Sequence, residues 1–269
     1  MSSETPTPAT TISARCATRE SGWYTVKTTL DHFATVTYAV PPERLRPLIH
    51  DDFDLHIVSI DGEDRALLSV VSFVDRDFRF RRVPWARWSF GQTNYRIYVR
   101  YRDQECAWFL GTTLASRFVA VPRYLWRLPW HGARTTIDAR YDATAARYER
   151  YLLTTKSEWG AAELTLDDTG EPAALLPGFS DLETQRLVLT HPVAGYYWRT
   201  DRRLGSYRIW HDRIQPTIGR ARHARFVLLD RLGIVSADEA SRPYSVLIQR
   251  SVPFEIYLPP RVVYNLPYA

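Results

Sequence analysis

Residues 114–136 read LASRFVAVPRYLWRLPWHGARTT, and this stretch decides how the rest of the chain is interpreted. It interrupts a run of strand-like segments with helical character, in which Pro122 starts or kinks the last turn and Pro129 ends it. A tight aromatic turn follows at Trp130. A short helix and turn between strands predict the floor of a pocket.

The segments around this stretch alternate as strands do. Residues 92–102 read QTNYRIYVRYR, which puts Tyr95 and Ile97 on one face and Asn94 and Arg96 on the other. In a barrel either face can look inward, so the sequence leaves open which set lines a cavity.

Turn signals and short strands recur along the whole chain. Asp61-Gly62 predicts a hairpin, and PPERLRPLI predicts a short helix after residue 40. Many closely spaced strands with few helices predict an α+β, mainly β fold. We expect a closed or nearly closed antiparallel β-barrel with a few short peripheral helices. Further strands are expected at ECAWFLGTT, ARTTIDARYD, ARYERYLLTT, AELTLDD, LETQRLVLT, AGYYWRT, GSYRIWHD and SVLIQRSVPFEIYLP.

The chain divides into a tail and one domain. Residues 1–22 are rich in Ser, Thr and Pro without apolar periodicity, so they predict a disordered N-terminal tail before a single domain at 23–269. No signal-peptide core or spanning apolar run appears, and Cys16 and Cys106 make neither a disulfide framework nor a metal site. These features favour a cytoplasmic protein with no membrane partner.

Charge and motif spacing argue against several function classes. The net charge is +5, but the basic residues are spread along the chain among 30 acids, so nucleic-acid binding is not expected. Of the 35 basic residues 33 are Arg, which fits a coding bias or selection for carboxylate or phosphate recognition. His50, Asp51, Asp52 and His56 lack metal-ligand spacing, and no metal or cofactor is expected.

Five phrases occur in order between residues 30 and 263: VPPERLRPLI, IDGEDRALLSVVSF, TNYRIYVRY, RYLWRLPW and YRIWHDRIQP. This ordered set resembles the uncharacterised YqjF-like proteins (domain of unknown function 2071), which are grouped with the acetoacetate decarboxylase-like superfamily. The resemblance implies a cone-like barrel around a pocket, a small-molecule rather than macromolecular ligand, and a homo-oligomer. It implies no particular activity.

The chain departs from acetoacetate decarboxylase at its reactive lysine. That enzyme resembles WGFPKK after the helix, where the lysine following the proline forms a Schiff base with a keto acid. Here WRLPWH puts Trp130 at the lysine position and His131 at its cationic neighbour, and GQTNY leaves Tyr95 where GPYNE has a glutamate. An indole supplies no primary amine, so Schiff-base decarboxylation is not expected unless Lys156 reaches the cavity.

Two positions are candidate catalytic residues. Arg96 shares a strand face with Asn94, and its guanidinium offers a bidentate fit to a carboxylate that the amide orients. The alternative is a charged exposed face or a structural ion pair. His131 is a candidate general acid or base near neutral pH, with a turn-capping role as the alternative.

The remaining candidates are expected to bind substrate. Trp130, with Tyr95 or Tyr98, is expected to form an apolar wall. Arg208 and His211 are weaker candidates on a later strand, and His211 also fits a structural histidine.

Two functions therefore stay open. The first is a barrel that binds a small carboxylate or carbonyl compound and acts as a lyase or isomerase through enolisation, dehydration or cyclisation. The second is a non-catalytic ligand-binding or structural protein of the same fold. Turnover by a His131→Ala variant separates them.

Overall fold

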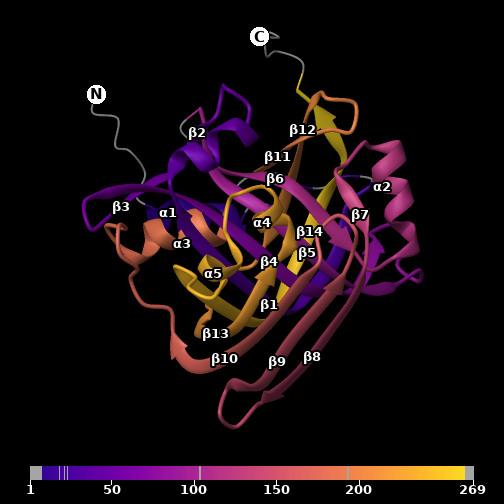
Figure 1. Ribbon diagram of the computed structural model, residues 1–269. Helices are drawn as coiled ribbons and strands as arrows, with labels where there is room; N and C mark the ends of the chain where they lie inside the picture. The colour runs from indigo at the N-terminus through magenta and orange to yellow at the C-terminus, as the bar shows by residue number, and fades with distance from the viewer. Residues whose placement is uncertain are drawn as a thin grey trace.

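The computed structural model describes residues 8–17, 19, 20, 22, 24–102, 104–192 and 194–263. Seven strands form a closed barrel, and the pairing of the last strand with the first completes the ring (Figure 1). The predicted mainly β, closed-barrel fold is confirmed, although one neighbouring pair, β6 with β11, is parallel. In order around the ring the strands are β1 (Val26–Val40), β4 (Glu63–Phe80), β5 (Trp88–Tyr101), β6 (Gln104–Leu114), β11 (Ala194–Trp198), β12 (Leu204–His211) and β14 (Ser245–Val262).

A second sheet branches from the barrel at β14 and folds back over its outer face. It is visible at the bottom of Figure 1, where β8, β9 and β10 run side by side. Three short strands, β2 (Asp54–Leu55), β3 (Ile57–Ile60) and β7 (Trp130–Gly132), pair with β5, β4 and β6. The four strands of the second sheet are β13 (Thr217–Phe226), β10 (Ala162–Pro172), β9 (Arg147–Lys156) and β8 (Arg134–Asp142).

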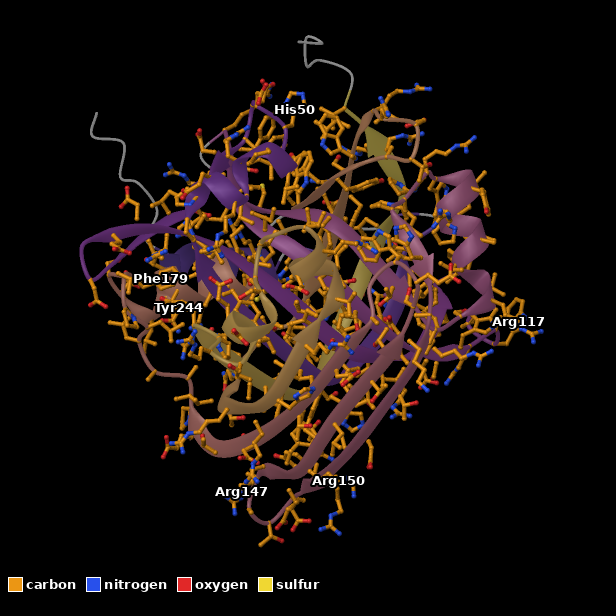
Figure 2. All side chains as sticks on the ribbon, in the orientation of Figure 1. His50, Arg117, Arg147, Arg150, Phe179 and Tyr244 are labelled. Atoms are coloured by element: carbon orange, nitrogen blue, oxygen red, sulfur yellow. The ribbon has the colours of Figure 1, made fainter. Side chains whose placement is uncertain are left out.

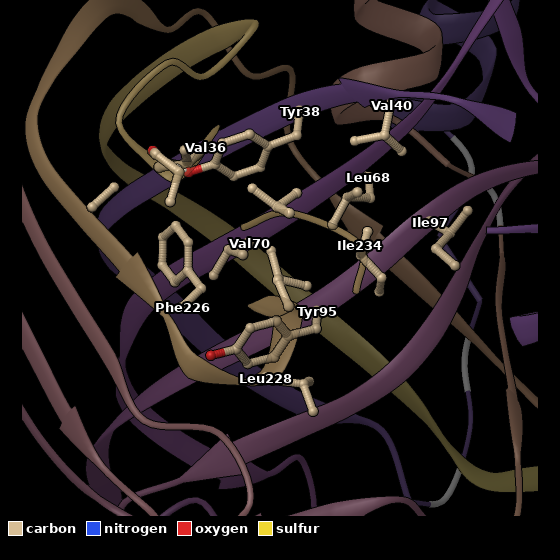
Figure 3. Close-up of a cluster of buried hydrophobic side chains, with 14 of the residues drawn as sticks. Val36, Tyr38, Val40, Leu68, Val70, Tyr95, Ile97, Phe226, Leu228 and Ile234 are labelled. Atoms are coloured by element: carbon tan, nitrogen blue, oxygen red, sulfur yellow. Dashed lines mark hydrogen bonds between the residues drawn. The ribbon is translucent and has the colours of Figure 1, made fainter. Parts of the chain in front are cut away.

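The main hydrophobic core lies between the barrel wall and this second sheet. Figure 3 shows Tyr38 and Tyr95 from the barrel near Phe226, the last residue of β13, and Leu228, which comes two residues later. Tyr38 also donates a hydrogen bond of 2.8 Å to the carbonyl of Ala240, so its polar end is satisfied inside the core. Each such large side chain contributes about 1.5–3 kcal/mol of burial free energy.

The structure settles which face of β5 looks inward. Tyr95 and Ile97 point outward into the core and are fully buried there. Because strand side chains alternate, Asn94 and Arg96 point into the barrel.

The Asp61-Gly62 hairpin is present. Ile60 pairs with Glu63, and both turn residues have positive φ values, 52° and 81°, as a two-residue type I′ turn requires. The short helix predicted after residue 40 is instead two 3₁₀ turns, η1 (Pro42–Arg44) and η2 (Arg46–Leu48).

The helix expected near Pro122 is α2 (Ala120–Leu125), which follows the 3₁₀ turn η3 (Arg117–Val119). The strand predicted at LETQRLVLT is wrong, because α3 (Leu182–Thr190) occupies this segment. Asp181 caps α3 by accepting a hydrogen bond from the Thr184 amide, and the buried residues recur at helical spacing. Two short helices that the sequence did not indicate are α4 (Val227–Arg231) and α5 (Ala237–Ala240).

The stretch predicted as a disordered tail contains a helix, α1 (Pro8–Ala17). It lies against α3 and β12, and Arg15 donates a 2.6 Å hydrogen bond to the carbonyl of His191. Residues 1–7 of the predicted tail lie outside the described residues. None of the helices in the described part of the chain is long and apolar enough to cross a membrane.

Candidate functional site

The barrel encloses a cavity of about 250 Å³ with mostly apolar walls. Strands β4, β5, β6, β12 and β14 contribute most of the wall, and α2 closes one side. Trp130, Phe109 and Phe73 are among the large side chains that line it. Its polar lining residues are few: Asp75, Gln92, Asn94, Arg96, Ser116, Thr190 and His211.

Arg96 lies at a closed end of the cavity, with 8% of its surface exposed. Its Nη2 donates to the carbonyl of Leu189 at 2.8 Å and to the hydroxyl of Tyr98 at 3.2 Å. Leu189 belongs to the last turn of α3, where the negative end of the helix dipole offsets part of the guanidinium charge.

The Arg96 guanidinium also lies 5.3 Å from the centre of the Tyr98 ring, but it has no carboxylate partner in the described part of the chain. Its Nε is buried without a hydrogen-bond acceptor, and no carboxylate among the described residues forms an ion pair with it. A buried cation without a counter-charge is costly, and an unmade charged hydrogen bond adds to that cost. An anionic or strongly polar ligand oxygen would remove both penalties.

His211 lies near this guanidinium, and His191 contacts His211. His211 lines the cavity, and its ring lies 4.6 Å from that of His191. Burial lowers the pKa of His211 to about 4, and the positive charge of Arg96 adds to the shift. Burial and the neighbouring His211 lower the pKa of His191 to about 3. Both rings are therefore neutral at pH 7, and Arg96 carries the positive charge at this end.

Asn94 extends the polar strip toward the other end. Its side-chain oxygen accepts hydrogen bonds from Gln92 at 2.9 Å and from Thr112 at 2.8 Å. Because both bonds use the oxygen, the amide NH₂ group remains available to a molecule in the cavity.

Asp75 is a cavity residue that the sequence reasoning missed. It is 2% exposed, and Thr28 donates to its Oδ1 at 3.1 Å. Burial raises the pKa of its carboxyl to about 7, which the Thr28 hydrogen bond only partly offsets. Asp75 pairs with Phe90 in the β4–β5 register, whereas Arg96 pairs with Ser69, so the two positions lie about 20 Å apart along β4.

The alternation of side chains along β4 is the sequence signal that points to Asp75 as a cavity residue. It shares a face with Val71 and Phe73, and both line the cavity. The sequence could not say that this face looks inward, so the carboxylate could not be assigned to the site.

Trp130 lines the cavity, but its neighbour His131 does not. Adjacent strand residues point to opposite faces, and His131 stacks on Trp159 with ring centroids 4.1 Å apart. Its Nδ1 lies 3.0 Å from Arg123, and burial together with that arginine lowers the pKa of His131 to about 4. The His131 ring therefore lies outside this cavity lining, and its catalytic role stays a prediction.

Three other predicted substrate-binding residues also lie outside the cavity lining. Tyr95 is in the main core, where its hydroxyl lies 3.4 Å from the carbonyl of Gly160. Tyr98 is fully buried behind Arg96. Arg208 faces outward and pairs with Glu20 at 2.5 Å. Of the eight predicted residues, those the structure brings to the cavity are Asn94, Arg96, Trp130 and His211.

The chain holds two lysines, and neither lines this cavity. Lys27 pairs with Glu255 at 3.4 Å, and Lys156 is exposed at the end of β9. Among the described residues no group of three His, Cys, Asp or Glu side chains could hold a metal ion.

Comparison with known protein families gives a match over residues 27–253 to DUF2071, an uncharacterized conserved protein. This chain belongs to the DUF2071 family. No curated protein matches it.

Solved structures with the same fold include acetoacetate decarboxylase and the enzyme MppR. The enduracididine biosynthesis enzyme MppR complexed with pyruvate is 12% identical, with a TM-score of 0.60 over 91% of this chain and 92% of that chain. Acetoacetate decarboxylase from Legionella pneumophila is 12% identical, with a TM-score of 0.55 over 98% of each chain. An acetoacetate decarboxylase-like enzyme from Sphingomonas wittichii RW1 is 13% identical, with a TM-score of 0.56 over 88% and 92%. At these identities the similarity establishes the fold of the DUF2071 chain.

Proposed function

We propose that the barrel binds a small organic molecule with an apolar body and one acidic or carbonyl head group. The head group accepts hydrogen bonds from Arg96 and Asn94 at the closed end, and the body contacts Trp130 and the other apolar walls. The observation that carries this proposal is the buried Arg96 guanidinium, which has no carboxylate partner among the described residues.

The apolar body and the polar head group of the ligand contribute different amounts of binding free energy. A ligand that buries roughly 200 Å² of apolar surface gains about 5 kcal/mol at 25 cal/mol per Å². A hydrogen bond to a charged group contributes about 1.5–3 kcal/mol. The apolar walls therefore set most of the affinity, and Arg96 sets which end of the ligand enters first and whether it is an acid.

The similar folds support a small-molecule ligand. MppR has been solved with pyruvate, a small oxo acid. A Schiff base at the decarboxylase position is not part of the proposal, since Trp130 stands there and neither lysine lines the cavity.

A catalytic extension of this proposal uses His211 in place of His131. The His211 ring lines the cavity and is neutral at pH 7, so it is able to accept a proton from a carbon next to a carbonyl that Arg96 polarises. This is the first step of an enolisation, dehydration or cyclisation. The non-catalytic alternative keeps the same ligand and lacks this proton transfer.

Thermal unfolding with a panel of keto acids, hydroxy acids and aromatic acids tests the binding proposal. An acid that raises the melting temperature of the wild type should fail to stabilise Arg96→Met. Arg220→Gln, an exposed arginine on β13, is the matched control and should respond like the wild type. The proposal is wrong if no acid stabilises the wild type, or if Arg96→Met responds equally.

Proton exchange separates the catalytic extension from the alternative. A bound keto acid should exchange its α-hydrogens with D₂O faster in the presence of wild type than of His211→Gln, as followed by NMR. Binding without accelerated exchange assigns the cavity to the non-catalytic function.

A further inference from the structure

Two segments border the cavity beside β5 and β6. Residues 79–90 span the end of β4, the connecting loop and the start of β5, and residues 115–134 contain η3, α2, β7 and the first residue of β8. Both contribute lining residues, among them Phe80, Trp88 and Val121, and in Figure 1 the β4–β5 loop lies below α2 at the right edge. We call these two segments the rim.

Large apolar side chains are exposed on the rim. Trp85 is 78% exposed, Leu125 is 67% exposed and Tyr124 is 65% exposed. Val83 and Val121 are exposed as well. Val121, Tyr124 and Leu125 lie on one face of α2, and this face is exposed to solvent. Of these five residues Val121 also lines the cavity, and exposed apolar side chains on segments that border a cavity indicate an interaction surface.

The rim is also rich in arginine. Its two segments contain eight arginines and no Asp or Glu: Arg79, Arg81, Arg82, Arg87, Arg117, Arg123, Arg127 and Arg134. Figure 2 shows Arg117 projecting outward at this edge, far from Arg147 and Arg150 at the bottom of the second sheet. Two carboxylates lie beside the rim. The backbone of Asp77 contacts Ser89 and Arg79, and Asp201 on a neighbouring loop pairs with Arg199 and Arg203.

The combination of arginines and exposed apolar side chains favours some binding partners of the rim over others. A second copy docking through the same face would bring one arginine cluster against another, which repels. The phosphates of a nucleic acid would match the arginines but gain nothing from exposed Leu125, Val83 and Val121. An anionic bilayer offers both, because lipid phosphates attract arginines while Trp, Tyr and Leu side chains enter the interface.

We propose that the rim docks on the surface of an anionic lipid membrane and holds the mouth of the cavity against the bilayer. Trp85, Tyr124 and Leu125 insert among the head groups, and the rim arginines contact lipid phosphates. The apolar walls then continue the apolar interior of the membrane. Docking of the rim on the membrane does not require a ligand. The idea that an apolar acid passes between the bilayer and the cavity rests on the proposed function.

Vesicle sedimentation without added ligand tests the docking. The full chain should sediment with vesicles of equal parts phosphatidylcholine and phosphatidylglycerol, should not sediment with phosphatidylcholine alone, and should be released by high salt. Arg81→Gln/Arg117→Gln should weaken binding by roughly 25-fold, at about fivefold for each charge. Trp85→Ser/Leu125→Ser should weaken it at least about tenfold.

Arg147→Gln/Arg220→Gln is the matched control, because it removes the same charge from exposed positions outside the rim and should bind like the wild type. All the substituted positions are exposed, and melting temperatures confirm folding. The proposal is overturned if the wild type ignores anionic vesicles or if the control loses binding equally. It is also overturned if rim variants change the oligomeric state, or if the arginine variant loses affinity for single-stranded RNA while vesicle binding persists. If vesicle binding fails but an acid still stabilises the wild type and not Arg96→Met, the docking proposal is wrong and the proposed function is unaffected.

Discussion

The two faces of β5 carry opposite chemistry within one short segment. On the outward face Tyr95 and Ile97 are fully buried in the core, and the Tyr95 hydroxyl lies within reach of the Gly160 carbonyl. On the inward face Arg96 is nearly as buried, yet its Nε has no acceptor, and the Asn94 amide group faces the cavity. Arg96 is buried much like Tyr95 and Ile97, but only the outward face has its polar atoms paired without a ligand.

The two faces of β5 are therefore expected to serve different purposes, the outward face folding stability and the inward face ligand binding. A residue of the outward face contributes to folding through packing, so its loss should lower the free energy of unfolding. A residue of the inward face keeps an unsatisfied polar group, so its loss should cost little stability and remove recognition. Neighbouring positions on one strand are thus expected to give opposite phenotypes.

The largest effect is expected on the outward face. Tyr95→Ala should lower the free energy of unfolding by about 3–5 kcal/mol, because it leaves a cavity among Trp159, Phe226 and the other core residues. Urea unfolding measures the change. Arg96→Met is the inward counterpart and should cost less than about 1 kcal/mol, since removing an uncompensated buried charge offsets the lost hydrogen bonds. Equal losses for the two variants would contradict the comparison.

The next effect concerns Asp75, on the inward face of β4. Its pKa is raised from 3.8 to about 7, so the folded state favours the protonated carboxyl. Stability is therefore unaffected below pH 4, falls as pH rises from about 4 to about 7, and remains lower above that range. Asp75→Asn removes this penalty and should raise the free energy of unfolding by up to ~4 kcal/mol at pH 8, with no gain at pH 4. A gain that is the same at both pH values would refute the ionisation argument.

The smallest effect is expected at His131, which faces away from the cavity. His131→Ala should change ligand affinity by less than about twofold, because the ring stacks on Trp159 outside the site, and should cost about 0.5–1.5 kcal/mol of stability. Titration calorimetry with a stabilising acid measures the affinity. A tenfold loss of ligand affinity would show that His131 contributes to the site and would contradict the assignment of inward and outward faces.

The fold was largely predictable because alternation and turn chemistry are local. The Asp61-Gly62 hairpin and the strand around Arg96 follow from the sequence alone. Residues 182–190 were misread because a short apolar run does not distinguish a buried strand from a buried helix, and the Asp181 cap was overlooked. The N-terminal helix was missed because its contacts with α3 and β12 are tertiary.

The site was only half predictable, and for a different reason. Period-two alternation groups Asn94 with Arg96 but does not say which face of the strand is inside. That is fixed by the ring closure between β1 and β14 and by the sheet folded over the outer face. The same alternation argues against pairing Trp130 with His131, since neighbours on a strand diverge. Asp75 could join the site only after the inward face of β4 was known.

The central claim is that Arg96 recognises the charged head of a bound acid. The most direct measurement is titration calorimetry of a stabilising acid and its primary amide against wild type, Arg96→Met and Arg96→Lys. We predict that wild type binds the acid about 10- to 100-fold more tightly than the amide, and that Arg96→Met loses this preference while Arg96→Lys keeps part of it. An equal preference for the acid in wild type and Arg96→Met would contradict the account.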